Sequence, residues 1–255
     1  MKRSVNFLAR SKGVVRYAGL LIIMMLAVSF MSGCMYPGDK RQENAVSYRE
    51  SVDRIQNALN QFQADKGILP IITAGEEVPR YEKFRIDLDK LHKMGYIDEI
   101  PATAFEQGGS AYFLVIDEET NPTVKVMDLV TVQKVNDVQR LVDQYGRSNP
   151  GQWPVTSETE VYPGLHEVDL NKVRGENYAL TSVFSREQLP YIVDANGQVY
   201  VDYAWDIMQA IDKSGSAVSE EDGDLRVILS NQSYFVPVKS LPYAWLDGAP
   251  VPQVE

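Results

Sequence analysis

Cysteine and histidine are nearly absent from this sequence, which narrows the chemistry open to it. Among 255 residues there is one cysteine, Cys34, and there are two histidines, His92 and His166. A single cysteine excludes an intramolecular disulfide framework and a cysteine-based zinc cluster. Glycine and proline number only 17 and 13, so a collagen-like or low-complexity chain is also excluded. With 44% hydrophobic and 24% charged residues, the composition is that of a globular protein of one or two domains.

The sequence also lacks an apolar run long enough to cross a bilayer comfortably. The longest run, residues 17–31, has 15 residues, whereas the ~30 Å hydrocarbon core requires about 20. Five basic residues and no acidic residue precede this run, an order that is typical of a signal peptide. The sequence therefore predicts a signal peptide over residues 1–33.

The apolar run ends in Met31-Ser32-Gly33-Cys34, which resembles the lipobox of bacterial lipoprotein precursors, with methionine in place of the usual leucine. This resemblance implies cleavage before Cys34 and a diacylglycerol on its sulfur. Such a group has the two acyl chains that stable membrane attachment requires. We therefore expect a lipid anchor at Cys34 on the extracytoplasmic face of the cell membrane. The alternative is an uncleaved anchor helix beside a chance cysteine.

Positive charge is scarce in the chain that would follow cleavage. Its 222 residues would carry a net charge of −15, because five of the 25 basic residues and none of the 35 acidic residues lie in residues 1–33. Such a surface repels phosphate backbones, so we expect no nucleic-acid partner. It favours cationic partners or loosely bound divalent ions, without identifying either.

Two amphipathic helices are predicted after a polar tether over residues 34–44. Each is indicated by an apolar stripe with steps of three and four residues. Gly67 is expected to end the first helix and Gly146 the second. The first stripe consists of Tyr48, Val52, Ile55, Leu59 and Phe62, and the second of Val132, Val135, Val138, Leu141, Val142 and Tyr145.

The segments after these helices match each other in sequence. Leu69-Pro70-Ile71 corresponds to Trp153-Pro154-Val155 at an offset of 84 residues, and residues 86–91 correspond to 168–173 at an offset of 82. Each copy then continues into a predicted hairpin, in which Asn196-Gly197 predicts a type I′ turn. The predicted strands are residues 111–116, 123–127, 190–193 and 199–201, and the predicted N-caps of the helices that follow are Asp128 and Asp202.

The matches predict an α+β fold of two similar helix/hairpin modules with antiparallel sheets, over residues 45–130 and 131–215. A chance similarity between the two is the alternative. Residues 216–255 depart from the repeat. They are predicted to contain an acidic linker at 216–224, a hairpin at 225–229 and 233–238, and a proline-rich tail from Leu241 that is extended or disordered.

Recognisable catalytic motifs are missing from the sequence. No G-x-S-x-G nucleophile motif, phosphate-binding loop or dinucleotide-binding glycine motif is present. Ser182 and Ser185 lie near His166 in sequence, which fixes no geometry. The sequence therefore predicts no catalytic residue and no cofactor, and Cys34 is its one candidate modification site.

A metal site is not expected either. Asp194, Asn196 and Asp202 partly resemble a calcium loop, but an EF-hand loop needs glycine at its sixth position and glutamate at its twelfth. Here Gly197 stands fourth and the twelfth residue is not glutamate. A hairpin turn explains the same residues. The acidic runs at 118–119 and 220–222 are interpreted as solvated surface.

The lipobox, together with residues 64–70 and 189–194, resembles a family of lipoproteins of Bacillus and its relatives. Some of these proteins carry a transporter-binding-protein label, but the resemblance implies no established activity and no functional residues. Residues 57–70 are also similar to the helix-to-loop junction of type II secretion pseudopilins, although the chain lacks a prepilin cleavage site.

These observations favour a non-enzymatic lipoprotein that binds or scaffolds at the cell envelope, with an envelope protein or a small-molecule ligand as its partner. One alternative is a solute-binding lipoprotein of an ABC transporter, which usually needs two lobes with parallel strands. A less favoured alternative is a cell-wall hydrolase, which needs a deep cleft lined by two close carboxylates.

Overall fold

The computed structural model describes residues 41–215 and 217–254, so the predicted signal peptide, the lipobox and Cys34 lie outside the described residues. The chain separates into two compact units, Met1–Glu43 and Asn44–Glu255, and the following description concerns the second unit. In the described part of the chain, no helix is long and apolar enough to span a membrane.

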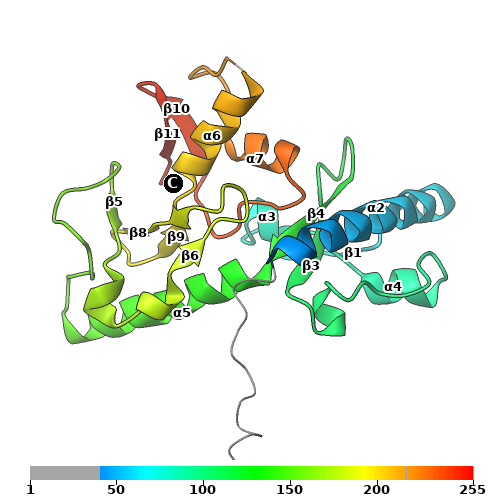
Figure 1. Cartoon of the computed structure of the whole chain (residues 1–255), viewed down its shortest axis with the longest axis horizontal. Coiled ribbons are helices and arrows are strands. Elements are labelled where there is room, and N and C mark those ends of the chain that lie inside the picture. The colour runs from blue at the N-terminus through cyan, green and yellow to red at the C-terminus, as the bar shows by residue number, and fades with distance from the viewer. Residues whose placement is uncertain (1–40, 216, 255) are drawn as a thin grey trace, which may run out of the picture. The chain divides into compact units, whose positions relative to one another are not determined.

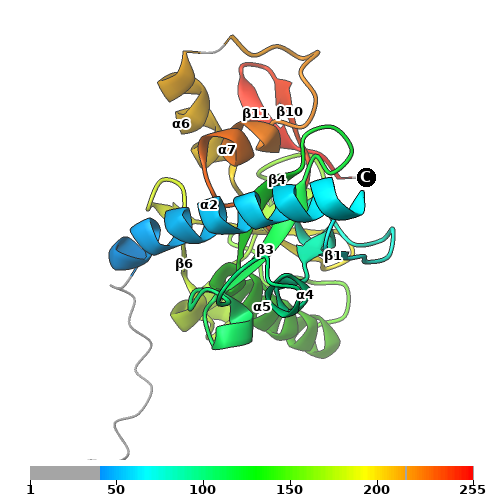
Figure 2. The same ribbon diagram turned by 90° about the vertical axis from the view of Figure 1, so that its right-hand side faces the viewer.

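The first half of Asn44–Glu255 combines one long helix with a four-stranded antiparallel sheet of order β1-β2-β3-β4 (Figures 1 and 2). The apolar stripe predicted on the first helix is its buried face, and it packs against β3 and β4. The helix begins at Arg41, inside the segment predicted as a tether. The elements are α2 (Arg41–Lys66), β1 (Ile71–Ile72), α3 (Arg80–Lys83), β2 (Arg85–Ile86), α4 (Leu88–Lys93), η2 (Phe105–Gln107), β3 (Ala111–Ile116) and β4 (Thr123–Asp128).

Helix α5 (Leu129–Ser148) leads from the first half into the second. Asp128 caps its start as predicted, because the Asp128 carboxylate accepts a hydrogen bond from the Thr131 N–H at 3.1 Å. The prediction that Gly146 ends this helix is wrong, since α5 continues to Ser148. A Cβ at Gly146 would lie 2.3 Å from Cζ3 of Trp153. Glycine therefore makes room for the indole here instead of stopping the helix.

The second half contains a three-stranded antiparallel sheet of order β5-β8-β9 and a two-stranded ladder of β6 and β7. Buried valines of α5 pack against this sheet. The elements are β5 (Leu165–Glu167), η3 (Leu170–Val173), η4 (Glu176–Tyr178), β6 (Leu180–Thr181), β7 (Gln188–Leu189), β8 (Tyr191–Asp194), β9 (Val199–Val201), α6 (Ala204–Ser214), α7 (Arg226–Gln232), β10 (Tyr243–Leu246) and β11 (Ala249–Pro252).

The segments that match in sequence occupy matching places in the two sheets. Val155 pairs with Val168 beside β5, as β1 pairs with β2. The N–H of Asp87 donates to the Pro70 carbonyl at 2.8 Å, and the N–H of Asp169 donates to the Pro154 carbonyl at 2.6 Å. The strand order around both sheets is therefore the same, while a duplication as its origin stays a prediction.

The hairpin predicted at Asn196-Gly197 is present, but its turn is not type I′. That turn needs positive φ at both central residues, and of these two only Gly197 has it, at 84°. Asp194 closes the turn instead: its Oδ1 accepts hydrogen bonds from the N–H groups of Asn196 at 2.9 Å and Gln198 at 2.8 Å. The turn is thus held by an aspartate side chain that bonds its own backbone.

The C-terminal prediction is wrong in detail. Residues 226–232 form α7, not a strand, because Leu225 and Leu229, four residues apart, are both buried as one helical face. The tail predicted to be extended or disordered carries the hairpin β10–β11. Its turn residues, Asp247 and Gly248, have φ of 49° and 81°, which is the type I′ pattern.

Residues 234–239, between α7 and β10, pair with both sheets. On the first sheet, Val126 of β4 donates its N–H to the Tyr234 carbonyl at 2.8 Å and accepts from the Val236 N–H at 3.1 Å. On the second sheet, Val201 of β9 donates its N–H to the Lys239 carbonyl at 2.8 Å. One segment therefore covers the edge strands of both halves and joins them.

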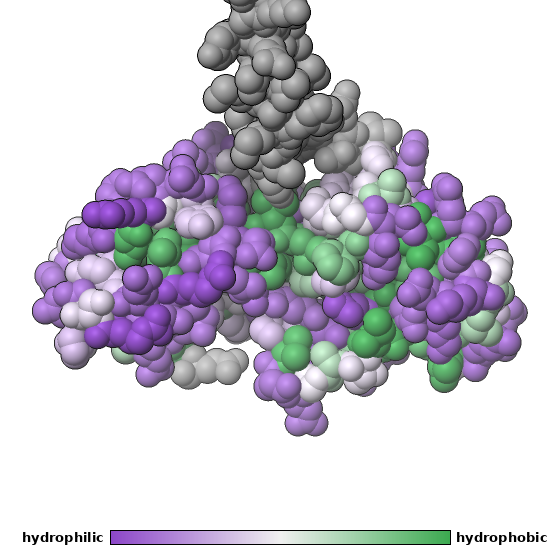
Figure 3. All heavy atoms as spheres, turned by 90° about the horizontal axis from the view of Figure 1, so that it is seen from below, coloured by the Kyte–Doolittle hydropathy of each residue, from purple (hydrophilic) through white to green (hydrophobic). Residues whose placement is uncertain are grey.

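The surface of the second unit is mainly polar on the face shown in Figure 3, where apolar side chains form small separate patches. Large apolar side chains that are well exposed occur on several different elements, among them Ile68, Met94, Phe105 and Trp205. We find no single apolar surface there that indicates a partner.

Candidate functional site

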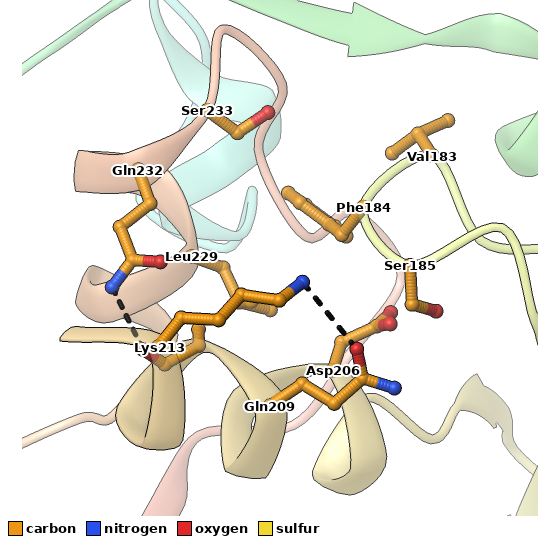
Figure 4. A pocket seen from close by; sticks show the side chains of 10 residues that line it. Val183, Phe184, Ser185, Asp206, Gln209, Lys213, Leu229, Gln232 and Ser233 are labelled. Carbon is orange, nitrogen blue, oxygen red and sulfur yellow. Dashed lines mark hydrogen bonds between the residues drawn. The ribbon is translucent and has the colours of Figure 1, made fainter. Parts of the chain in front are cut away.

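A cavity of about 220 Å³ lies between α6, α7 and the loop that follows β6 (Figure 4). Its apolar lining comes from Phe184 on the loop, Ala210 on α6 and Leu229 on α7. Its polar side chains come from the same three segments: Ser185, Asp206, Gln209, Lys213, Gln232 and Ser233.

Helix α6 carries one acidic residue on its buried face, and this residue lines the cavity. Asp206 is 2% exposed and lies one turn before the buried Ala210. Its Oδ2 accepts a hydrogen bond from the Ser182 hydroxyl at 2.6 Å. Its Oδ1 is buried and accepts no hydrogen bond. A buried carboxylate oxygen without a donor is uncommon, because such groups are costly to leave unpaired.

The environment of Asp206 shifts its acidity. Burial raises the pKa of Asp206 above its ordinary value of 3.8, and the negative charge of Asp202 adds to this effect. The hydrogen bond from Ser182 lowers the pKa, as do the nearby hydroxyl and N–H of Ser185, although neither of these Ser185 groups meets hydrogen-bond geometry at Oδ1. Burial is the largest of these effects, so the charged form of Asp206 is only partly stabilised.

Ser182 supports Asp206 and does not face the cavity. Its side chain is fully buried, and its oxygen accepts hydrogen bonds from the N–H groups of Phe184 at 2.9 Å and Ser185 at 3.2 Å. These contacts fold the loop around the hydroxyl and direct its proton to Asp206. Such a hydroxyl is held in place and closed to solvent, unlike a nucleophile, which must reach a substrate.

The rim of the cavity carries a cation. Figure 4 shows Lys213 reaching across the cavity along α6, with its ammonium on the same side as Asp206 and Gln209. Lys213 Nζ donates to Gln209 Oε1 at 3.5 Å, and it makes no ion pair with a carboxylate of the described residues. Gln232 closes the opposite side, where its amide donates to the Ala210 carbonyl at 3.0 Å.

The structure separates the residues that the sequence placed close together. His166 lies in β5, where its Nε2 is 3.2 Å from the Glu158 carbonyl oxygen, and it does not meet Ser182. Glu118 and Glu119 line an open hollow of about 480 Å³ that also has Arg80 and Lys83 on its wall. Arg80 forms an ion pair with Asp117 on the same wall, at 2.6 Å.

The carboxylates of the partial calcium loop are already used by the protein. Asp194 holds its own turn, as described above. Asp202 accepts hydrogen bonds from the Tyr162 and Tyr243 hydroxyls and from the Ala204 N–H, each at 2.9 Å. The prediction that Asp202 is the N-cap of α6 is wrong, because the N-cap is the next residue, Tyr203. Within residues 41–215 and 217–254, no three His, Cys, Asp or Glu side chains gather as a metal site.

Sequence reasoning missed Asp206 as a site residue. Its signal was local, since Ala210, four positions after it, is apolar and falls on the same helical face. The aromatic residues of this region are mainly structural, because Tyr191 and Tyr203 are buried. Trp205 is 59% exposed and does not line the cavity.

The fold and cavity thus define an α+β protein with small antiparallel sheets and a small cavity that contains one buried acid. Residues 48–128 match the YphF family N-terminal domain, a family of Bacillus type. This match runs from Tyr48, inside α2, to the end of β4, whereas the cavity lies outside it. No curated protein and no solved structure matches the chain significantly.

Proposed function

We propose that this protein is a lipoprotein, anchored by a diacylglycerol on Cys34 to the extracytoplasmic face of the cell membrane, that binds a small molecule at the cell envelope without transforming it. The observation that carries the proposal is the Asp206 cavity. Asp206 lines a hollow of solute size and has a buried carboxylate oxygen without a hydrogen bond, and a ligand with a hydrogen-bond donor would complete this arrangement.

The contents of the cavity favour binding over hydrolysis. A glycosidase needs two carboxyl groups on either side of the scissile bond, and Asp206 is the one acidic residue that lines this cavity. Ser182 cannot serve as the nucleophile of another hydrolase because it is buried behind the loop. The cell-wall hydrolase is therefore the weaker reading.

A solute-binding lipoprotein of an ABC transporter is the second candidate, and the cavity favours it as well. Importer proteins of this kind usually have parallel sheets. The sheets of the described residues are antiparallel, and parallel pairing there is limited to single bridges such as Val126 with Phe235. We therefore keep the transporter role as the alternative and small-molecule binding at the envelope as the proposal.

The anchor is tested by replacing Cys34 with serine. Because serine has no thiol to accept the diacyl group, we expect the variant to incorporate no labelled palmitate and to accumulate as unprocessed precursor. Normal labelling and processing of Cys34→Ser would reject the lipoprotein assignment.

The binding role is tested with the full chain in detergent micelles, by thermal-shift screening against a chemically diverse set of small solutes. We expect at least one solute to raise the unfolding midpoint saturably, and Asp206→Asn to remove that rise. If no solute acts, or if every active solute acts equally on Asp206→Asn, the cavity is not the binding site.

A further inference from the structure

We infer that the Asp206 cavity binds a free α-amino acid of small size, whose ammonium group donates to Asp206 Oδ1 and whose carboxylate pairs with Lys213. This inference rests on the proposed function and names the ligand class of the same site.

The inner end of the cavity calls for a hydrogen-bond donor. Asp206 Oδ1 is buried and has no donor, while Oδ2 is already bonded to Ser182. A ligand ammonium offers three N–H donors and a positive charge, so it completes the carboxylate with a charge-assisted hydrogen bond. A neutral hydroxyl would supply the hydrogen bond without the charge.

The rim calls for an anion. Lys213 lies seven residues after Asp206 on α6, and Gln209 and Ala210 lie between them on the same face. The two charged residues are therefore two helical turns apart, about 10 Å along the axis, and the long lysine side chain extends back over the cavity (Figure 4). Its ammonium has no carboxylate partner among the described residues.

These two charges decide between ligand classes. An anion would meet the Asp206 carboxylate at the inner end of the cavity. A cation without a carboxylate would satisfy Asp206 but meet the like charge of Lys213 at the rim. A zwitterion satisfies both. Being neutral overall, it is also neither repelled nor attracted at long range by the excess of acidic residues in this chain.

The volume sets the size of the ligand. A cavity of about 220 Å³ equals roughly seven waters at their ~30 Å³ share of liquid volume, which corresponds to an amino acid such as alanine, serine or threonine. The walls suit a short side chain that is either apolar or carries a hydroxyl, because Phe184 and Leu229 are apolar while Ser185 and Ser233 carry hydroxyls.

The test is isothermal titration of the full chain in detergent micelles with L-alanine, L-serine and L-threonine. Two half-probes accompany them: ethanolamine, which lacks the carboxylate, and lactate, which lacks the ammonium. We expect saturable binding of at least one amino acid, and at least tenfold weaker binding of both half-probes.

Three variants separate the roles of the two charges. Asp206→Asn should weaken amino-acid binding at least tenfold. Lys213→Gln, at an exposed position, should weaken the binding of amino acids about tenfold and leave the binding of ethanolamine unchanged or tighter. Asp212→Asn, on α6 but outside the cavity lining, should leave all affinities unchanged and serves as the matched control.

Other results would overturn the inference in distinguishable ways. Ethanolamine binding as tightly as the amino acids, with no effect of Lys213→Gln, would replace the zwitterion with a simple amine. Another solute bound in an Asp206-dependent manner, while amino acids are not bound, would overturn the ligand class and retain the proposed function. Absence of binding by amino acids and by the diverse solutes would overturn both.

Discussion

The Ser182 hydroxyl donates a 2.6 Å hydrogen bond to Oδ2 of Asp206 and leaves Oδ1 of the same carboxylate buried without a donor. Two segments 24 residues apart therefore cooperate to hold a half-satisfied acid. A purely structural aspartate would be expected to have both oxygens paired. The half-satisfied state is a cost to folding, and it gives a way to test whether Asp206 is retained for binding.

Replacing Asp206 with asparagine should stabilise the ligand-free protein at pH 7. Burial raises the pKa of Asp206 above 3.8, so the folded state favours the protonated acid. That contribution to stability is fully present below pH 3.8 and is lost as the pH rises through the folded-state pKa. Asparagine carries no charge and avoids the loss. For a gain of about 1 kcal/mol in the free energy of unfolding, the unfolding midpoint should rise by about 2–4 °C.

The measurement is urea unfolding of both proteins between pH 3 and pH 8. The advantage of Asp206→Asn should shrink toward acid pH, where aspartate is neutral as well. Asp212→Asn, on the exposed face of the same helix, is the control and should show no such trend. A variant less stable than the parent across this whole range would mean that the carboxylate is needed for folding.

Replacing Ser182 with alanine should destabilise the protein at neutral pH. The variant removes the one hydrogen-bond donor of Asp206 and the acceptor of two backbone N–H groups in the loop. Each buried group left unpaired costs about 1–3 kcal/mol. Chemical denaturation should show a loss in this range, and the loss should be smaller in the Asp206→Asn background. Equal losses in both backgrounds would show that Ser182 acts on the loop alone.

Replacing Gly146 with alanine should destabilise α5, contrary to the usual rule for helices. Alanine in a helix interior is normally better than glycine by about 1 kcal/mol. Here its Cβ would lie 2.3 Å from Cζ3 of Trp153, and the indole cannot move easily because it also packs on Gly197 and its Nε1 donates to the Ala195 carbonyl at 3.3 Å. Overpacking of this kind costs about 1–3 kcal/mol.

A double-mutant cycle tests this explanation, in which Gly146→Ala is also made in a Trp153→Ala background. With the ring removed, Gly146→Ala should recover the normal sign and stabilise the helix. The free energy of unfolding from urea titrations of the four proteins gives the coupling directly. Independent, additive effects would show that the contact with Trp153 does not decide the residue at position 146.

Most of the secondary structure could be predicted because it depends on local patterns. The apolar stripe from Tyr48 to Phe62 is the buried face of α2, and strand β3 has the predicted bounds. The sequence predicts a strand at residues 233–238 that pairs with residues 225–229, but residues 234–239 pair with the edges of β4 and β9 instead, and no local pattern contains these long-range contacts. The hairpin β10–β11 did carry a local signal, Asp247-Gly248. Pro250 and Pro252 masked it, although prolines are tolerated on an edge strand.

Only part of the candidate site could be predicted from the sequence. Asp206 stands in helical register with Ala210, so an acid on a buried helix face could be recognised from the sequence. Its hydrogen-bond donor, Ser182, and the opposite wall at Leu229 belong to other segments that only the tertiary fold brings together. The sequence had directed attention to Ser182 through His166, which lies elsewhere in β5.

Millimolar calcium should barely change the unfolding midpoint of the protein at about 0.15 M salt. The oxygens of Asp194 and Asp202 already accept hydrogen bonds from the protein, and a calcium site needs several free oxygens at about 2.3–2.6 Å from the ion. Weak attraction by the negative surface is screened by salt. A saturable, salt-resistant rise of several degrees that is lost in Asp194→Ala would contradict this and establish metal-dependent binding.

The protein should lose stability steeply above pH 10 because its buried tyrosines resist ionisation. Burial is the largest cause that raises the pKa of each of Tyr81, Tyr162, Tyr191, Tyr203 and Tyr243. Their contribution to stability is complete below pH 10, where unfolded tyrosines are also protonated, and is lost as the pH rises toward the folded-state values. Each tyrosine that stays protonated in the folded protein lowers the free energy of unfolding by up to about 1.4 kcal/mol per pH unit. Lys125 acts in the opposite direction, because burial lowers its pKa, but it is one group against five.

Urea unfolding at half-unit steps from pH 8 to pH 11 measures this slope, and Tyr243→Phe tests its origin. Phenylalanine keeps the ring but has no proton to release. The free energy of unfolding should therefore fall less steeply above pH 10, and the difference in slope should equal the contribution of a single tyrosine. At pH 8 the variant should already be less stable, because the Tyr243 hydroxyl donates to Asp202 at 2.9 Å and accepts from the Tyr203 N–H at 2.8 Å. An unchanged alkaline slope in Tyr243→Phe would show that this hydroxyl ionises as readily in the folded protein as in the unfolded chain.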